Sequence, residues 1–426
     1  MRRGAGGRLI AALLAWGLAF PALAGTAVAA PRPTVDPSAP TPTAPRSGPP
    51  PQGEAPDGST VGGKALDTRG TVVADGAPPL PEGLAASGWL VADAGTGDVL
   101  AARDPHGRYY PASTLKTLTL LTLAPRLDPA QVVPITVEDE NIEGSRVGIV
   151  VGGQYPVSLL FQGLMLQSGN DAANALARAA GGVGATVEAM NATAARLGAF
   201  DTVAGTPSGL DVAGQSSSPY DLALVMRQLV ADPYTLDVLR TPTAVIPGVE
   251  GLATAYQIQN QDTLLQSYPG TLGGKTGFTD AARHTFVAAV ERDGRRLVVS
   301  LMQAERRPVH ELQQATLLLD WGFSTPRDAT GVGRLVEPGE VSTVAPPPTT
   351  TPTATGSGKF DGTRDDLPSA SAAATPSTAP EGSPAGSGSP LLPIALVGGA
   401  GLIVTATVAG RLRARRVPAR HDPPAG

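Results

Sequence analysis

The stretch Tyr110-Pro111-Ala112-Ser113-Thr114-Leu115-Lys116-Thr117 places a serine and a lysine three residues apart at the start of an apolar run. On a helix this spacing brings both side chains to one face, where they can touch. A lysine whose pKa is lowered by burial and by nearby positive charge can act as the base that a serine nucleophile needs. Ser113 would lie in the first turn, whose free backbone N–H groups can stabilise an oxyanion. Taken alone, however, Ser-x-x-Lys favours an ordinary helix start with an exposed lysine.

Lysine is scarce in this chain, so its positions are informative. The sequence contains 28 arginines and only four lysines, Lys64, Lys116, Lys275 and Lys359. Of these, Lys116 and Lys275 lie in the region that we expect to fold. Arginine cannot lose its proton in a protein, whereas a desolvated lysine can become a neutral base. Codon preference would give the same bias, so the lysine count supports a chemical role without establishing one.

Two further motifs are weak when taken singly. Ser168-Gly169-Asn170 lies between two helical patterns, where it could face a cleft but more simply caps a helix. Lys275-Thr276-Gly277-Phe278 lies in a glycine-rich β context, where Gly277 would let a substrate backbone approach closely. The alternative is a strand edge with a solvated lysine. A phosphate-binding loop is a poor interpretation, because the required Gly-x-x-x-x-Gly-Lys-Ser/Thr at the start of a helix is missing.

The ordered combination of the three motifs is specific. Ser-x-x-Lys, Ser-x-Asn and Lys-Thr-Gly are typical of penicillin-binding proteins and serine β-lactamases, and here they begin in that order at positions 113, 168 and 275. From about residue 88 to 321 the chain resembles the low-molecular-weight penicillin-binding proteins of the D-alanyl-D-alanine carboxypeptidase family, peptidase family S11. Thr206-Pro207-Ser208-Gly209-Leu210-Asp211 and residues 260–265 are also similar to segments of that family.

The resemblance implies a role for each motif residue. Ser113 would be the acylated nucleophile, Lys116 the base and Ser168 a proton relay. Asn170 would hold the substrate amide, and Lys275 and Thr276 the terminal carboxylate of the peptide. The backbone N–H groups of Ser113 and Phe278, beside Gly277, would form the oxyanion hole. The reaction would be a serine-type D-Ala-D-Ala carboxypeptidase reaction on peptidoglycan stem peptides. β-Lactams would acylate the same serine, and neither a cofactor nor a metal is expected.

The secondary-structure pattern predicts an α+β domain, which the resemblance specifies as a penicillin-binding protein or serine β-lactamase-like fold with an antiparallel sheet and a helical subdomain. Strands are expected at 89–92, 99–102, 285–290 and 296–301, the last two joined by the turn signal Asp293-Gly294. Helices are expected at 112–123, 157–166, 172–180, 220–230 and 309–321. Because strands occur at both ends of this region, we expect them to share one sheet.

The flanking segments predict export and a membrane tether. Residues 1–29 have the basic and apolar regions of a signal peptide, with Ala27-Val28-Ala29 as the cleavage site; an uncleaved anchor is the alternative. Residues 30–83 and 343–390 are expected to be Pro-rich linkers on either side of a catalytic domain at 84–342. Residues 391–410 form an uncharged apolar run long enough to span a bilayer, and the basic tail 411–426 would stay cytoplasmic. The catalytic domain would then lie on the extracytoplasmic side of the cell membrane.

Composition and missing motifs argue against several other functions. The chain has no cysteine, which excludes disulfides and thiolate catalysis, and its net charge of −5 with no basic patch argues against a nucleic-acid partner. A class A β-lactamase would need a deacylating glutamate, and Glu188 does not lie in the Glu-x-x-Leu-Asn context expected for it. A Ser-His-Asp hydrolase is disfavoured because no Gly-x-Ser-x-Gly elbow is evident and His284 fits a structural role in a strand. A non-catalytic peptidoglycan-binding module is the alternative from another class, and the presence of all the motif side chains argues against it.

Two departures from the family pattern leave the substrate preference open. Arg283 stands where the family more often has glycine. The family's frequent β-rich C-terminal domain is not expected either, because a linker is expected to follow the closing helix.

Overall fold

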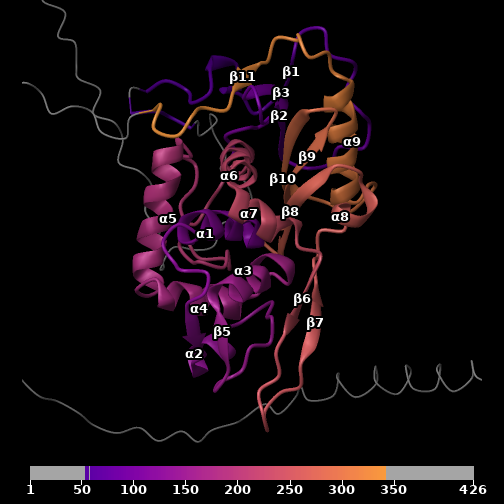
Figure 1. The fold of residues 1–426 in the computed structure, drawn as a ribbon. Coiled ribbons are helices and arrows are strands. Elements are labelled where there is room, and N and C mark those ends of the chain that lie inside the picture. The colour runs from indigo at the N-terminus through magenta and orange to yellow at the C-terminus, as the bar shows by residue number, and fades with distance from the viewer. Residues whose placement is uncertain (1–52, 57, 342–426) are drawn as a thin grey trace, which may run out of the picture. The chain divides into compact units, whose positions relative to one another are not determined.

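The computed structural model describes residues 53–56 and 58–341 (Figure 1). Their centre is an antiparallel sheet with the strand order β1-β3-β2-β10-β9-β8, to which β11 adds beside β3. The strands are β1 (Thr71–Val73), β2 (Gly88–Asp93), β3 (Asp98–Arg103), β8 (Thr271–Thr279), β9 (Arg283–Arg292), β10 (Arg295–Ala304) and β11 (Gly333–Arg334). β2 pairs with β10 from Gly88↔Met302 to Asp93↔Leu297, which confirms that strands from both ends of the folded region share one sheet.

Alternating side chains of the sheet pack against helices on opposite faces. Leu90 and Ala92 of β2 belong to the core cluster that contains α6 (Pro219–Ala231), whereas Trp89 and Val91 pack with α9 (Glu311–Ser324). Figure 1 shows α6 and α9 on either side of the sheet. Because successive residues of a strand point to opposite faces, burial of every β2 residue requires this double cover.

The helical part of the fold surrounds one short helix. η2 (Ala112–Leu115) runs directly into α1 (Lys116–Leu123), which packs against α3 (Val157–Leu166), α4 (Asn170–Ala179), α5 (Val183–Leu197) and α6. All residues of α1 except Leu121 are buried. The Ser-x-x-Lys motif therefore lies at the centre of the domain, which agrees with the expected helical subdomain. The remaining elements are α2 (Val137–Glu140), α7 (Pro233–Arg240), α8 (Leu264–Ser267), and the strand pairs β4 (Val132–Pro134) with β5 (Gln154–Pro156) and β6 (Thr243–Ile246) with β7 (Tyr256–Gln259).

The folded region extends further at its N-terminal end than we expected. Residues 53–56 and 58–83, assigned to a linker by their composition, belong to the domain: β1 pairs with β3, and Val61, Leu66 and Ala74 are buried. A few apolar side chains anchor this Pro- and Gly-rich segment, although its mean composition favours a disordered chain.

The closing helix is also not followed directly by a linker. The chain returns after α9, adds β11 to the sheet and buries Leu335 and Val336. These contacts lie within residues 325–341, so this return segment belongs to the domain.

The predicted signal peptide at 1–29, the linker at 343–390, the membrane span at 391–410 and the tail at 411–426 all lie outside the described residues. Among residues 53–56 and 58–341, no helix combines the length and the hydrophobicity that crossing a bilayer requires.

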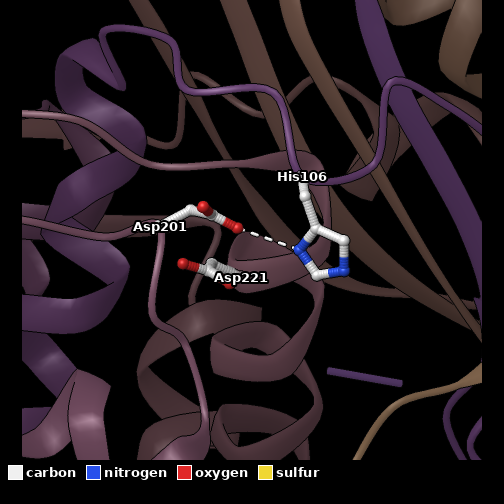
Figure 2. A group of neighbouring side chains, drawn as sticks. All are labelled: His106, Asp201 and Asp221. Carbon is white, nitrogen blue, oxygen red and sulfur yellow. Dashed lines mark hydrogen bonds and ion pairs between the residues drawn. The ribbon is translucent and has the colours of Figure 1, made fainter. Parts of the chain in front are cut away.

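A buried charged group joins the N-terminal segment to the helical part (Figure 2). The imidazole of His106, 1 % exposed, has Nδ1 2.9 Å from Asp201 Oδ2 and Nε2 3.1 Å from the Val61 carbonyl. Both ring nitrogens face acceptors, so both are satisfied only when the ring is protonated. Asp221 supplies a second carboxylate, and Arg108 donates to the other oxygen of Asp201. The group thus forms a buried ion-pair network rather than a set of free metal ligands.

This network predicts a dependence of stability on pH. Burial lowers the pKa of His106, but the hydrogen bond to Asp201 and the charges of Asp201 and Asp221 outweigh it and raise the pKa above 6.5. The stabilisation by protonated His106 is therefore complete below the pKa that this residue has in the unfolded chain. It is lost as pH rises through the pKa of His106 in the folded protein. We expect the free energy of unfolding to fall as the pH rises above about 6.5, and His106→Gln to lower it by about 3 kcal/mol at pH 6 and to flatten its dependence on pH.

Urea unfolding across this pH range measures the effect. His310→Asn is the matched control, because His310 is 44 % exposed and Asn also caps helices well. If the free energy of unfolding fell with pH equally steeply in wild type and His106→Gln, His106 would not be the group that causes this pH dependence.

Candidate active site

The turn that carries Ser113 is held from two sides. The Pro111 carbonyl accepts hydrogen bonds from Thr114 Oγ1 at 2.6 Å and from Thr285 Oγ1 of β9 at 2.8 Å. On the other side, Gly209 lies so close that a Cβ there would be 1.9 Å from the Ala112 oxygen. Ser113 itself is half-buried. The position of its hydroxyl is therefore set jointly by the sheet and by the loop at 206–211.

Lys116 is fully buried beside Ser113. Its Nζ lies 2.9 Å from Ser113 Oγ, 2.7 Å from Asn170 Oδ1 and 2.7 Å from the Ser208 carbonyl. Asn170 Oδ1 and the Ser208 oxygen can only accept hydrogen bonds, so they take two N–H groups of the amine. A neutral lysine then directs its lone pair at the Ser113 hydroxyl, as a base must.

The surroundings of Lys116 favour this neutral form. Burial and, secondarily, the charge of Lys275 hold the pKa of Lys116 well below its usual 10.5, while the charge of Asp171 opposes them. Asp171 is itself held in place, because its carboxylate accepts backbone N–H groups of Val147 and Gly148 at 2.9 and 2.7 Å.

The second motif contributes Asn170 directly. Its Nδ2 donates to the Glu143 carbonyl at 2.6 Å while its Oδ1 accepts from Lys116, so the carboxamide orients the lysine. Ser168 is 3 % exposed in the turn between α3 and α4, with φ +59°, a strained conformation for a non-glycine residue. Among the described residues, no hydrogen bond joins the Ser168 hydroxyl to Ser113 or Lys116. Its relay role and the contact of Asn170 with substrate stay predictions.

The third motif lies on β8, the outer strand of the sheet, which packs against η2. Lys275 is 1 % exposed, and its Nζ donates to the Thr276 carbonyl at 2.7 Å. Burial lowers the pKa of Lys275 to about 7, and the charge of Asp262 opposes this shift. Lys275 therefore carries its charge up to about neutral pH.

Gly277 brings β8 against the nucleophile turn. A Cβ at this position would lie 2.3 Å from Thr285 Oγ1 and 2.9 Å from the Ser113 nitrogen. The next residue, Phe278, has a ring that is 49 % exposed and lies 4.6 Å from the ring of His284. The strand edge thus borders the N–H groups that the sequence predicts for an oxyanion hole.

Gly277→Ala is expected to slow acylation of Ser113 by about 10²-fold, because the added methyl group forces β8 away from the turn and misplaces the oxyanion donors. The rate of covalent labelling by a fluorescent penicillin measures this effect. Gly184→Ala is the control, since no atom lies within 4 Å of the Cβ it would add on α5. Equal labelling rates for Gly277→Ala and wild type would show that β8 has no such constraint.

Other contacts of the site had no clear sequence signal. The Ser208 carbonyl binds Lys116, and Thr285 anchors the turn, yet a backbone acceptor or a threonine in a strand has no pattern of its own. Arg283 has φ +54°, which explains why glycine suits this position, and it pairs with both carboxylate oxygens of Glu305. Glu188 is exposed on α5.

Comparison with known proteins agrees with this geometry. The family model for D-alanyl-D-alanine carboxypeptidase, Peptidase S11, matches residues 74–306. D-alanyl-D-alanine carboxypeptidase DacB2 of Mycobacterium tuberculosis is 45% identical over 262 residues, which are 60% of this chain and 88% of the relative. DacD of Escherichia coli is 31% identical over 258 residues, 57% of this chain and 64% of the relative.

Solved structures show the same fold. The crystal structure of a D-alanyl-D-alanine carboxypeptidase from Mycobacterium tuberculosis has a TM-score of 0.59 at 43% identity, covering 62% of this chain and all of that one. The Streptomyces K15 DD-transpeptidase has a TM-score of 0.54 at 27% identity, over 58% of this chain and all of that one. The predicted α+β fold of the penicillin-binding proteins is thereby confirmed, and the chain belongs to the D-alanyl-D-alanine carboxypeptidase family, peptidase family S11.

Proposed function

We propose that this protein removes the terminal D-alanine from peptidoglycan stem peptides through an acyl-enzyme on Ser113. One observation carries the proposal: the buried amine of Lys116 lies 2.9 Å from Ser113 Oγ, and its other two contacts are acceptors. The arrangement provides a nucleophile and an adjacent base, which acyl transfer requires.

The reaction follows from these positions. Ser113 Oγ attacks the carbonyl carbon of the penultimate D-alanine while its proton passes to Lys116 Nζ. The N–H groups of Ser113 and Phe278 hold the oxyanion. When the peptide bond breaks, the leaving D-alanine amine takes the proton, with Ser168 as the relay. Water then attacks the ester, gives a proton to Lys116, and releases the shortened peptide as Ser113 recovers its hydroxyl proton.

Lys275 and Thr276 supply the recognition of the substrate. An ammonium group attracts the terminal carboxylate, so binding needs Lys275 protonated, whereas attack needs Lys116 neutral. We therefore expect kcat/KM to rise with pH as Lys116 loses its proton. It should fall again above about pH 7, where Lys275 loses its own.

A fluorescent penicillin tests the proposal. β-Lactams would acylate Ser113 and leave a stable adduct that is visible after denaturing electrophoresis. Rapid release of hydrolysed drug would instead indicate a β-lactamase, a reading that the exposed position of Glu188 does not favour. Absence of labelling in the folded wild-type protein would exclude penicillin binding.

The flanking sequences support a location for this activity. The apolar stretches at 1–29 and 391–410 and the basic tail at 411–426 suggest export and a single membrane span, with the catalytic domain extracytoplasmic. Protease treatment of intact cells tests this topology: we expect digestion of the domain and protection of a tag placed on the tail. Protection of the domain would contradict it.

A further inference from the structure

The loop at 206–211 supports the proposed catalytic base. Its Ser208 carbonyl accepts a hydrogen bond from Lys116 Nζ, and its Pro207 carbonyl accepts one from Thr119 Oγ1, both at 2.7 Å. Lys116 and Thr119 belong to the same helix, α1, and both are fully buried. The loop is therefore attached to this helix at two points, and a displacement of the loop would move an acceptor away from the base.

The same loop supports the nucleophile turn, whose backbone is strained. Ala112, directly before Ser113, has φ +46°, a conformation that a non-glycine residue keeps only where its surroundings hold it. A Cβ on Gly209 would lie 1.9 Å from the Ala112 oxygen, so the loop lies directly against this residue. On another side, Ala112 packs with Tyr110 and Ala282. The loop and the turn between β8 and β9, to which Ala282 belongs, thus hold the strained residue together.

One side-chain hydrogen bond joins this loop to the end of β8. Thr279, the last residue of β8, donates from Oγ1 to Asp211 Oδ1 at 3.0 Å, and the same oxygen accepts the Ala282 N–H at 2.9 Å. A hydroxyl has one proton and two lone pairs, so the two contacts are compatible. Thr279 and Asp211 are both half-buried. In the described part of the chain, no other hydrogen bond links residues 206–211 to β8.

The end of β8 also carries a predicted oxyanion donor. Phe278, whose N–H is expected to face the oxyanion, directly precedes Thr279, and Gly277 lies against the Ser113 nitrogen. Donors stabilise an oxyanion well only when they are fixed in position before the reaction. The bond between Thr279 and Asp211 therefore connects the strand of the oxyanion donor to the loop that supports the base and the nucleophile.

We propose that Asp211 and Thr279 are positioning residues, whose hydrogen bond holds the end of β8 in place against the nucleophile turn so that Ser113 is acylated rapidly. Neither residue supplies an atom to the reaction, because the pair acts through the positions of Ser113 and Phe278. The inference rests on the proposed function for its effect on acylation. Its effect on the end of β8 is measured separately.

Thr279→Val tests the proposal, because valine keeps the shape of the side chain and removes the hydroxyl. We expect the limiting rate of Ser113 acylation by a fluorescent penicillin to fall about tenfold, since the oxyanion donor is no longer held in place. The drug concentration that gives half of this rate should change by less than about twofold. Thr279→Ser restores the hydroxyl and should react at about the wild-type rate. Rapid mixing followed by denaturing electrophoresis measures both constants.

Asp211→Ala removes the other half of the bond and leaves the contact between Thr279 and Ala282 in place. It should slow acylation by a similar factor, and the double variant should be little slower than Thr279→Val, because both changes break one interaction. Thr96→Val is the matched control. In the exposed turn between β2 and β3, Thr96 Oγ1 likewise donates to a carboxylate, that of Asp98 at 2.7 Å, and accepts the Asp98 N–H at 3.2 Å.

Three kinetic results would overturn the proposal. These are a wild-type acylation rate in Thr279→Val, an equal loss in Thr96→Val, and losses in the two single variants that multiply in the double variant. Urea unfolding shows which variants are folded. Because Thr279→Val and Asp211→Ala break the bond from opposite sides, either folded variant decides whether the bond matters.

Hydrogen exchange of residues 271–282, followed by mass spectrometry, measures the end of β8 without any substrate. We expect faster exchange in Thr279→Val than in wild type, and no change in Thr96→Val. If the penicillin does not label the folded wild-type protein, the proposed function fails. Unchanged exchange in Thr279→Val would instead overturn the positioning role, whether or not the protein is labelled.

Discussion

Ser113→Ala is expected to lower D-alanine release from a pentapeptide by 10⁴-fold or more, on the order of the loss seen when a serine nucleophile is removed, and to abolish penicillin labelling. The physical reason is that, among residues 53–56 and 58–341, no other hydroxyl forms a hydrogen bond with the Lys116 amine: its remaining contacts are Asn170 Oδ1 and the Ser208 carbonyl. Without the Ser113 oxygen, no covalent intermediate forms.

Ser267→Ala serves as the control for this variant, because Ser267 is an exposed serine on α8. Steady-state release of D-alanine and electrophoresis of labelled protein give the two readouts. Persistent labelling of folded Ser113→Ala would place the nucleophile elsewhere.

Lys116→Arg is expected to lose about 10³-fold in kcat, the scale of a missing general base. Arginine keeps the positive charge but cannot give up a proton, so it cannot accept the proton of Ser113. Lys116 is fully buried among Ser113, Asn170 and Ser208, and the larger guanidinium also strains this packing.

Lys275→Arg tests whether position 275 needs only a positive charge, in contrast to position 116, which must accept a proton. An arginine there still attracts a carboxylate, so partial activity is expected. Urea unfolding of both variants shows whether they are folded before their kinetics are compared. A folded Lys116→Arg that kept most of its activity would mean that Lys116 is not the base.

The sequence predicted the main strands and helices because their patterns are local. The short apolar runs at 89–92 and 99–102 and the Asp293-Gly294 turn correspond to β2, β3 and the β9–β10 hairpin. The sequence pattern did not reveal α5 (Val183–Leu197), which begins directly after Gly181-Gly182. Residues 53–56 and 58–83 were assigned to a linker because their contacts with the sheet are long-range and have no periodic pattern in the sequence.

In the active site, too, the sequence predicted the residues that belong to local motifs and did not predict the contacts between distant segments. The motif pattern predicted that Ser113, Lys116 and Asn170 act together, and the structure joins them through the Lys116 amine. The contact of the Ser208 carbonyl with Lys116 could not be predicted, because a backbone acceptor acquires its role only when distant segments of the chain meet.

Mass spectrometry of a pentapeptide muropeptide incubated with the wild-type protein tests the central claim most directly. The account predicts a tetrapeptide product that has lost one terminal alanine, at a rate that Ser113→Ala reduces to background. An unchanged pentapeptide in the presence of folded enzyme would contradict it.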